Sequence, residues 1–351
     1  MLSKKELNEI KQHLENAVNP VFFYDNDADG LCSYLLLRRF INRGNGAIVR
    51  SFPALGIDYF KRIEELSADY IFILDKPVVS KEFFDEVEKI NIPVVWIDHH
   101  EINKKDIPKF VHYYNPLFSK KKSNEPVTAI CYELTKRKED LWLAVIGCVS
   151  DKFFPDFYSE FLKQFSDLSI DSKDAFKIYY DSLIGKVARI FGCGLKDSAR
   201  NIVFMQRFLE KVKSPHFILE ESEDTKFMHA RFNFINKRQE KLISKAISEA
   251  KDNFIFFKYA GDLSISSDLS NELIYRFPDK LILVVYANGY KANISGRGKN
   301  IRKIVLDSIN GLDGATGGGH EMAVGAQINI SQLEEFEKRF MEFLNNKIYK
   351  H

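Results

Sequence analysis

The chain has 351 residues, of which 45% are hydrophobic and 28% charged, and its formal net charge is +2. This length suffices for two domains with separate cores. The near-neutral balance excludes a bulk attraction to nucleic acid, so any basic groove must be local. The charged N-terminus is unlike a signal peptide, and no window has the roughly 20 apolar residues of a membrane span. We therefore expect a cytoplasmic protein without membrane contact.

Predicted strands and helices alternate through the first 150 residues. Apolar runs predict strands at 21–24, 47–52, 70–74, 93–97 and 111–116, and helical spacing predicts helices at 3–16, 31–41, 59–66, 81–90, 128–136 and 141–149. Such alternation is typical of βαβ units and a parallel sheet flanked by helices. Because right-handed crossovers carry the chain back over the sheet, the carboxyl ends of the strands share one edge. We predict an α/β fold with a five-stranded parallel sheet.

The remainder of the chain divides into a helical part and a second α/β part. Residues 153–212 read as a helical insert that completes the first domain, 1–212, and a long amphipathic helix dominates a linker at 213–252. Strands at 254–259, 281–287 and 290–295, with helices at 271–276, 301–310 and 332–347, predict a smaller domain with a mixed sheet at 253–351. The Asn288-Gly289 pair is a strong hairpin signal.

Three aspartates follow the first predicted strand at a spacing of two. If the chain stays extended over Asp25, Asp27 and Asp29, their side chains point the same way at the end of the strand. Converging carboxylates repel each other unless cations or solvent separate them. Hard divalent ions with oxygen ligands, Mg²⁺ or Mn²⁺, are the natural occupants, and a polar turn after a strand is the alternative interpretation.

Further acidic and histidine residues close other predicted elements. Asp75 follows the strand at 70–74, the triplet Asp98-His99-His100 follows the strand at 93–97, and Asp151 follows the helix at 141–149. Ligands of open α/β folds bind in the crevice outside the strand ends. The pattern therefore predicts one metal-binding site built from these four segments.

These motifs, in this order, resemble those of the DHH phosphoesterase superfamily, which is named for the triplet that stands here as Asp98-His99-His100. Gly317-Gly318-Gly319-His320 resembles the glycine-histidine motif of the associated DHHA1 domain. The resemblance implies two divalent cations, with Mn²⁺ preferred or Mg²⁺ used instead. The implied metal ligands are Asp25, Asp27, Asp29, Asp75, His99 and Asp151, of which Asp75 bridges the two cations.

The resemblance also implies roles beyond metal binding. His100 contacts the scissile phosphate or protonates the leaving group, Asp98 orients a histidine ring, and Asp29 belongs to the catalytic set as well as to the metal ligands. The C-terminal domain binds substrate and does no chemistry. The implied substrate-binding residues are Ser295, Arg297, Gly317, Gly318, Gly319 and His320.

Three functions are compatible with this resemblance. An aspartate at position 25 favours the RecJ-like branch, exonucleases that cleave single-stranded DNA or RNA to mononucleotides. The compact two-domain plan suits nanoRNase-type enzymes, which act on short oligonucleotides, 3′-phosphoadenosine-5′-phosphate or cyclic dinucleotides. A Cdc45-like replication scaffold without catalysis is the third. Single-stranded nucleic acid or short oligonucleotides are the expected partners, and binding to replication or repair proteins stays open beside catalysis.

Overall fold

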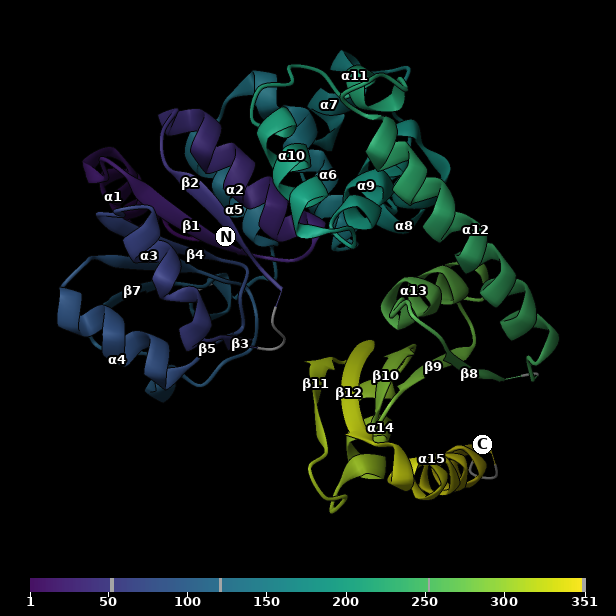
Figure 1. The fold of residues 1–351 in the computed structure, drawn as a ribbon. Coiled ribbons are helices and arrows are strands. Elements are labelled where there is room, and N and C mark those ends of the chain that lie inside the picture. Colours follow the sequence, from purple (N-terminus) through teal and green to yellow (C-terminus); the bar gives the residue numbers. More distant parts are fainter. Residues whose placement is uncertain (51–53, 120–121, 252, 349–351) are drawn as a thin grey trace. The chain divides into compact units, whose positions relative to one another are not determined.

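The structure is a computed structural model, and it describes residues 1–50, 54–119, 122–251 and 253–348 (Figure 1). The chain divides into two compact units, of which the first is Met1–Asn233 and the second begins at Phe234. The border lies inside the stretch predicted as the linker. Among the described helices, none combines the length and the apolar character that crossing a membrane requires.

A five-stranded parallel sheet forms the centre of the first unit, as predicted. Its order is β2-β1-β4-β6-β7. The strands are β2 (Asn45–Val49), β1 (Pro20–Asp25), β4 (Tyr70–Leu74), β6 (Val94–Ile97) and β7 (Val111–Tyr114). Because all neighbours are parallel, the carboxyl ends of β1, β4 and β6 lie at one edge of the sheet. β3 (Ala54–Leu55) and β5 (Val78–Val79) form a separate two-stranded sheet.

Helices cover both faces of this parallel sheet (Figure 1). Phe22 and Tyr24 of β1 belong to the larger core on one face, and Val21 and Phe23 belong to the core on the other. The larger core includes residues of α1 (Lys4–Asn16), α2 (Ala28–Ile41), α5 (Val127–Thr135) and α6 (Leu141–Ser150), and the smaller includes residues of α3 (Lys61–Glu65) and α4 (Lys81–Ile90). Burial on both faces explains why β1 is apolar at successive positions.

A helical region extends the larger core, as the sequence predicted for residues 153–212. Hydrogen bonds join this region to β1 and α2. The Tyr24 hydroxyl of β1 donates to Gln206 Oε1 at 2.8 Å, and Arg39 of α2 donates to the carbonyl oxygens of Leu209 and Val212. The helices are α7 (Tyr158–Gln164), α8 (Ala175–Asp181), α9 (Leu183–Gly194), α10 (Ala199–Leu209) and α11 (His216–Leu219), followed by the long α12 (Lys226–Ser248).

The second unit contains a mixed five-stranded sheet of order β11-β12-β10-β9-β8. β8 pairs parallel with β9, and the other pairs are antiparallel. Its elements are β8 (Phe254–Ala260), α13 (Ser266–Arg276), β9 (Leu281–Asn288), β10 (Lys291–Arg297), α14 (Ile301–Ile309), β11 (Thr316–His320), β12 (Ala323–Asn329) and α15 (Leu333–Ile348). The predicted hairpin joins β9 to β10, and Gly289 has the positive φ of 58° that such a turn requires.

Gly147 of α6 allows that helix to pack against the start of α5. A Cβ atom at this position would lie 2.2 Å from Thr128 Oγ1. We expect Gly147→Ala to lower the free energy of unfolding by about 1–3 kcal/mol, because an overpacked core must move apart. Gly192→Ala in α9 is the matched control, since its Cβ would meet nothing within 4 Å. Urea unfolding of both variants checks this, and an equal loss in both would contradict the packing account.

Candidate metal centre

The three alternating aspartates do not lie on an extended strand. Asp25 is the last residue of β1, Asp27 is the N-cap of α2, and Asp29 lies in the first turn of that helix. The prediction of an extended run was therefore wrong. The helix begins three residues earlier than predicted because the Asp27 carboxylate accepts a hydrogen bond from the Gly30 N–H at 2.9 Å, which caps the helix.

Asp29 is buried against the beginning of α5. Its two carboxylate oxygens accept hydrogen bonds from the backbone N–H groups of Val127, at 2.9 Å, and Thr128, at 2.7 Å. Unpaired N–H groups and the helix dipole both favour a carboxylate at a helix N-terminus. Burial, followed by the nearby charge of Asp151, nevertheless raises the pKa of Asp29 to about 6. The N-terminus of α5 thus holds the Asp29 carboxylate in place, but its two hydrogen bonds do not fully offset the free-energy cost of burying the charge.

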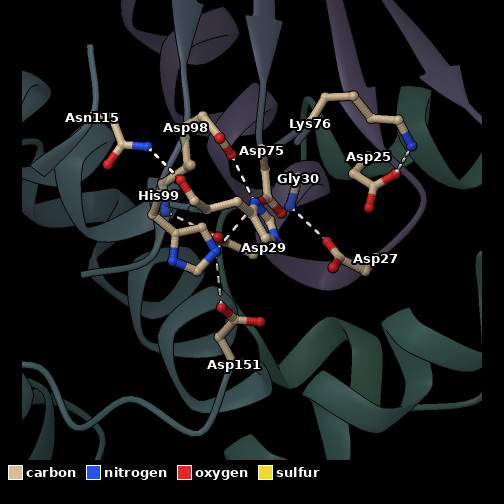
Figure 2. Close-up of polar contacts among 12 residues, drawn as sticks. Asp25, Asp27, Asp29, Gly30, Asp75, Lys76, Asp98, His99, Asn115 and Asp151 are labelled. Carbon is tan, nitrogen blue, oxygen red and sulfur yellow. Dashed lines mark hydrogen bonds and ion pairs between the residues drawn. The ribbon is translucent and has the colours of Figure 1, made fainter. Parts of the chain in front are cut away.

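Asp75 and His99 meet where β4 and β6 end (Figure 2). Asp75 has a left-handed backbone with φ of 58°, and its N–H donates to the Ile97 carbonyl. His99 Nε2 lies 3.4 Å from Asp75 Oδ1 and 3.4 Å from Asp151 Oδ2. Within the described part of the chain, Asp75 Oδ1 and His99 Nδ1 are buried without a hydrogen-bond partner. Buried carboxylate oxygens that lack a donor are suited to a cation.

Two groups of three side chains place their ligand atoms within 4.8 Å of one another among the described residues. One group is Asp29, His99 and Asp151, and the other is Asp75, His99 and His100. Burial and the charges of the neighbouring aspartates hold the pKa of Asp75 well above its usual range. Carboxylates with one imidazole are ligands that Mn²⁺ and Mg²⁺ accept. The residues present therefore fit a divalent cation.

His100 is paired with Asp98 rather than with the converging carboxylates. His100 Nδ1 lies 2.8 Å from Asp98 Oδ1 and 3.8 Å from Asp75 Oδ1. Burial disfavours the charged imidazole, but the hydrogen bond and charge of Asp98 outweigh it and raise the pKa of His100 to about 9. The same contact, acting against burial, holds the pKa of Asp98 below its usual range. His100 is therefore a cation at neutral pH in the absence of bound metal.

Two residues of the β7 segment support this pair. The Tyr113 hydroxyl donates to Asp98 Oδ2 at 3.2 Å, and the Asn115 side-chain amide donates to the Tyr113 hydroxyl and to the His100 carbonyl. Tyr113 was not among the residues predicted for the site. Its position in a short strand gives no signal of this role, because only the pairing of β6 with β7 brings it beside Asp98.

Asp25 contacts a lysine that the sequence analysis also missed. Lys76 Nζ donates to Asp25 Oδ1 at 2.6 Å (Figure 2). The lysine directly follows Asp75, and only 1% of it is exposed. Desolvation by the surrounding protein atoms, followed by the charge of Asp25, raises the pKa of Asp27, although Asp27 keeps contact with solvent. Of the six predicted metal ligands, Asp29, Asp75, His99 and Asp151 thus converge, whereas Asp25 is ion-paired and Asp27 caps α2.

The second unit brings Ser295 and Arg297 of β10 together with α13. Arg297 donates to the Ser295 hydroxyl, to Asn271 Oδ1 at 2.7 Å and to the Ser267 hydroxyl. Ser295 also shares a hydrogen bond of 2.8 Å with Ser270. The three residues from α13 were not predicted for the site, and only Asn271 lay within the helix predicted at 271–276, because α13 begins at Ser266.

The glycine-rich motif forms an edge strand, β11, which was not among the predicted strands. Gly325 of β12 pairs with Ser295 on one side and with Gly318 on the other, and Ala323 pairs likewise with Arg297 and His320. Cβ atoms at Gly318 and Gly325 would meet nothing within 4 Å. The backbone is therefore open to a ligand beside Ser295. The side chain of His320 lies outside the described part of the structure.

Fold and site together define a two-unit α/β protein with a candidate divalent-metal centre at the carboxyl edge of its parallel sheet. The model of the DHH family, N-terminal domain, matches residues 21–149, and that of the DHHA1 domain matches residues 241–346. The chain belongs to the DHH/DHHA1 family, whose members are generally metal-dependent phosphoesterases. No curated protein matches it in sequence.

Solved structures share the fold at low sequence identity. A RecJ from Thermus thermophilus in complex with Mn²⁺ has a TM-score of 0.71 at 14% identity over 98% of this chain, which spans 55% of that RecJ. A manganese-bound exonuclease RecJ has a TM-score of 0.66 at 14% identity, with 97% of this chain and 95% of that one covered. Cdc45 from Entamoeba histolytica has a TM-score of 0.53 at 9% identity, with 96% and 98% covered.

The Asp98 carboxylate is expected to control the charge of His100. We expect Asp98→Asn to lower the pKa of His100 from about 9 toward the ordinary histidine value of 6.5, because the variant removes the paired negative charge. NMR titration of the ring proton in metal-free protein measures this. Tyr113→Phe is the control, since it removes a neutral hydrogen bond and leaves the carboxylate in place. An unchanged pKa in Asp98→Asn would show that other carboxylates hold the proton on His100.

Proposed function

We propose that the protein is a Mn²⁺- or Mg²⁺-dependent phosphodiesterase, a RecJ-like exonuclease that cleaves single-stranded DNA or RNA to mononucleotides. The observation that carries the proposal is the convergence of Asp29, Asp75 and Asp151 on His99, with Asp75 Oδ1 buried and without a hydrogen-bond partner among the described residues. Without a bound cation, the buried Asp75 Oδ1 would have no hydrogen-bond donor among the described residues. The likeness of the fold to RecJ supports the choice of substrate.

The residues of the centre divide the chemistry among them. A divalent cation, when bound, polarises a phosphate and lowers the pKa of water. Asp29, Asp75, His99 and Asp151 would hold it. His100, protonated through its contact with Asp98, donates a hydrogen bond or a proton to the leaving oxygen of the phosphodiester. Asp98 and Tyr113 keep the imidazole in place while the proton moves.

Ser295 and Arg297 of the second unit are proposed to bind a substrate phosphate. The Arg297 guanidinium is held by Asn271 and Ser267 of α13, so little side-chain freedom is lost when a phosphate binds. The open backbone at Gly318 allows a phosphate or sugar to approach β11 closely. This unit is expected to contribute affinity and no chemistry.

Loss of a metal ligand is expected to abolish hydrolysis. Asp29→Asn and His99→Ala should lower Mn²⁺-dependent cleavage of end-labelled strands by more than about 100-fold with the circular dichroism spectrum unchanged, because the cation loses a ligand. Asp85→Asn on the surface of α4 is the control and should keep full activity. Full activity in either ligand variant would exclude this centre from catalysis.

Products from DNA and RNA strands of different length separate the candidate functions. Mononucleotide ladders from long strands support the exonuclease, and cleavage confined to very short strands would reassign the protein to the nanoRNase type. No cleavage by the wild type would favour a scaffold that shares the fold of Cdc45.

Arg297→Ala tests the role of the second unit. We expect KM to rise by about 10-fold or more and kcat to change by less than about 3-fold, because a phosphate contact made in both the ground and transition states is lost. Lys291→Ala is the matched control: it removes a cation from the exposed start of the same strand. Steady-state kinetics on an oligonucleotide measures both. A fall in kcat without a rise in KM would place Arg297 in the catalytic step.

A further inference from the structure

The Lys76 ammonium lies inside the metal centre, although the family pattern assigns no role to this position. Lys76 Nζ is 2.6 Å from Asp25 Oδ1, and the side chain is 1% exposed while that of Asp25 is 24% exposed. Trp96 Nε1 donates to the Lys76 carbonyl at 2.9 Å, which fixes the backbone from the neighbouring strand. The ammonium therefore has a fixed, buried position in the site, unlike the charge of a surface lysine.

Burial of a lysine ammonium is unfavourable unless negative charge compensates it. Asp25 supplies one carboxylate in direct contact with the ammonium. The ammonium thus neutralises the negative charge of Asp25. A divalent cation bound at Asp25 would neutralise the same charge. The two positive charges would repel each other strongly in so buried a site.

Among the described residues, the side chains whose ligand atoms are in mutual reach do not include Asp25 or Asp27. Both groups of such side chains share His99. Four ligands are thus arranged around His99, and the Asp25 side of the site is occupied by Lys76.

We propose that Lys76 takes the place of one of the two cations that the family pattern implies. The centre then binds one divalent cation, on Asp29, Asp75, His99 and Asp151, and the lysine ammonium is the positive group at Asp25. This inference deepens the proposed phosphodiesterase function and rests on it for the role of the charge: the ammonium offsets negative charge of the aspartates that would otherwise repel a substrate phosphate.

Metal stoichiometry tests the assignment without an activity assay. Isothermal titration calorimetry and native mass spectrometry with Mn²⁺ alone should give one ion per wild-type chain. Lys76→Met should bind two ions, because the uncovered Asp25 carboxylate becomes available with Asp27. Two ions bound by the wild type, or one ion bound by both proteins, would overturn the proposal.

Asp25→Asn is a second variant that keeps the test decisive if Lys76→Met does not fold. Under the proposal it binds one Mn²⁺ ion with a dissociation constant within about 3-fold of the wild type, since Asp25 is not a ligand of that ion. A loss of more than about 10-fold would place Asp25 on the cation and overturn the proposal. One ion bound without any hydrolysis would contradict the proposed function alone, whereas two ions would contradict this inference alone.

Discussion

Crowding of negative charge at the edge of a parallel sheet is the constraint on which the rest of this structure depends. Asp27, Asp29 and Asp75 all have raised pKa values because each lies among other carboxylates in a partly desolvated site, in which Asp29 and Asp75 are buried. Such an arrangement costs stability in the absence of a bound cation. The hydrogen bonds and ion pairs that surround these aspartates each offset part of that cost.

Three kinds of compensation are built into the fold. The N-terminus of α5 donates two backbone hydrogen bonds to Asp29, Lys76 forms an ion pair with Asp25, and His100 forms one with Asp98. They leave the oxygens around His99 as the part of the centre open to a cation. A divalent ion there would complete the charge balance, and under the proposed function it would also stand beside the phosphodiester to be cleaved.

The sequence predicted the strands and helices around the parallel sheet well because their patterns are strong, whereas β11 and β12 of the second sheet were not predicted. Apolar strands that alternate with amphipathic helices are typical of a parallel sheet, because the helices bury both faces of the sheet. The DHH triplet and the aspartates at strand ends led directly to the segments that form the centre. The second sheet was predicted as mixed, and the Asn288-Gly289 turn was placed correctly.

What the sequence did not reveal depends on contacts between distant segments. Lys76 looks like any loop lysine until β1 and β4 pair and bring it to Asp25. Tyr113 likewise reaches Asp98 only through the register of β6 and β7. The glycine motif reads as a loop because glycine is unfavourable in strands, but β12 supplies the pairing that makes it an edge strand.

Anomalous diffraction from a crystal grown with Mn²⁺ tests the central claim most directly. We predict a strong peak within bonding distance of His99 Nε2 and of carboxylate oxygens from Asp29, Asp75 and Asp151. A peak elsewhere, or none at a Mn²⁺ concentration that supports hydrolysis, would contradict the account of this site as a metal centre.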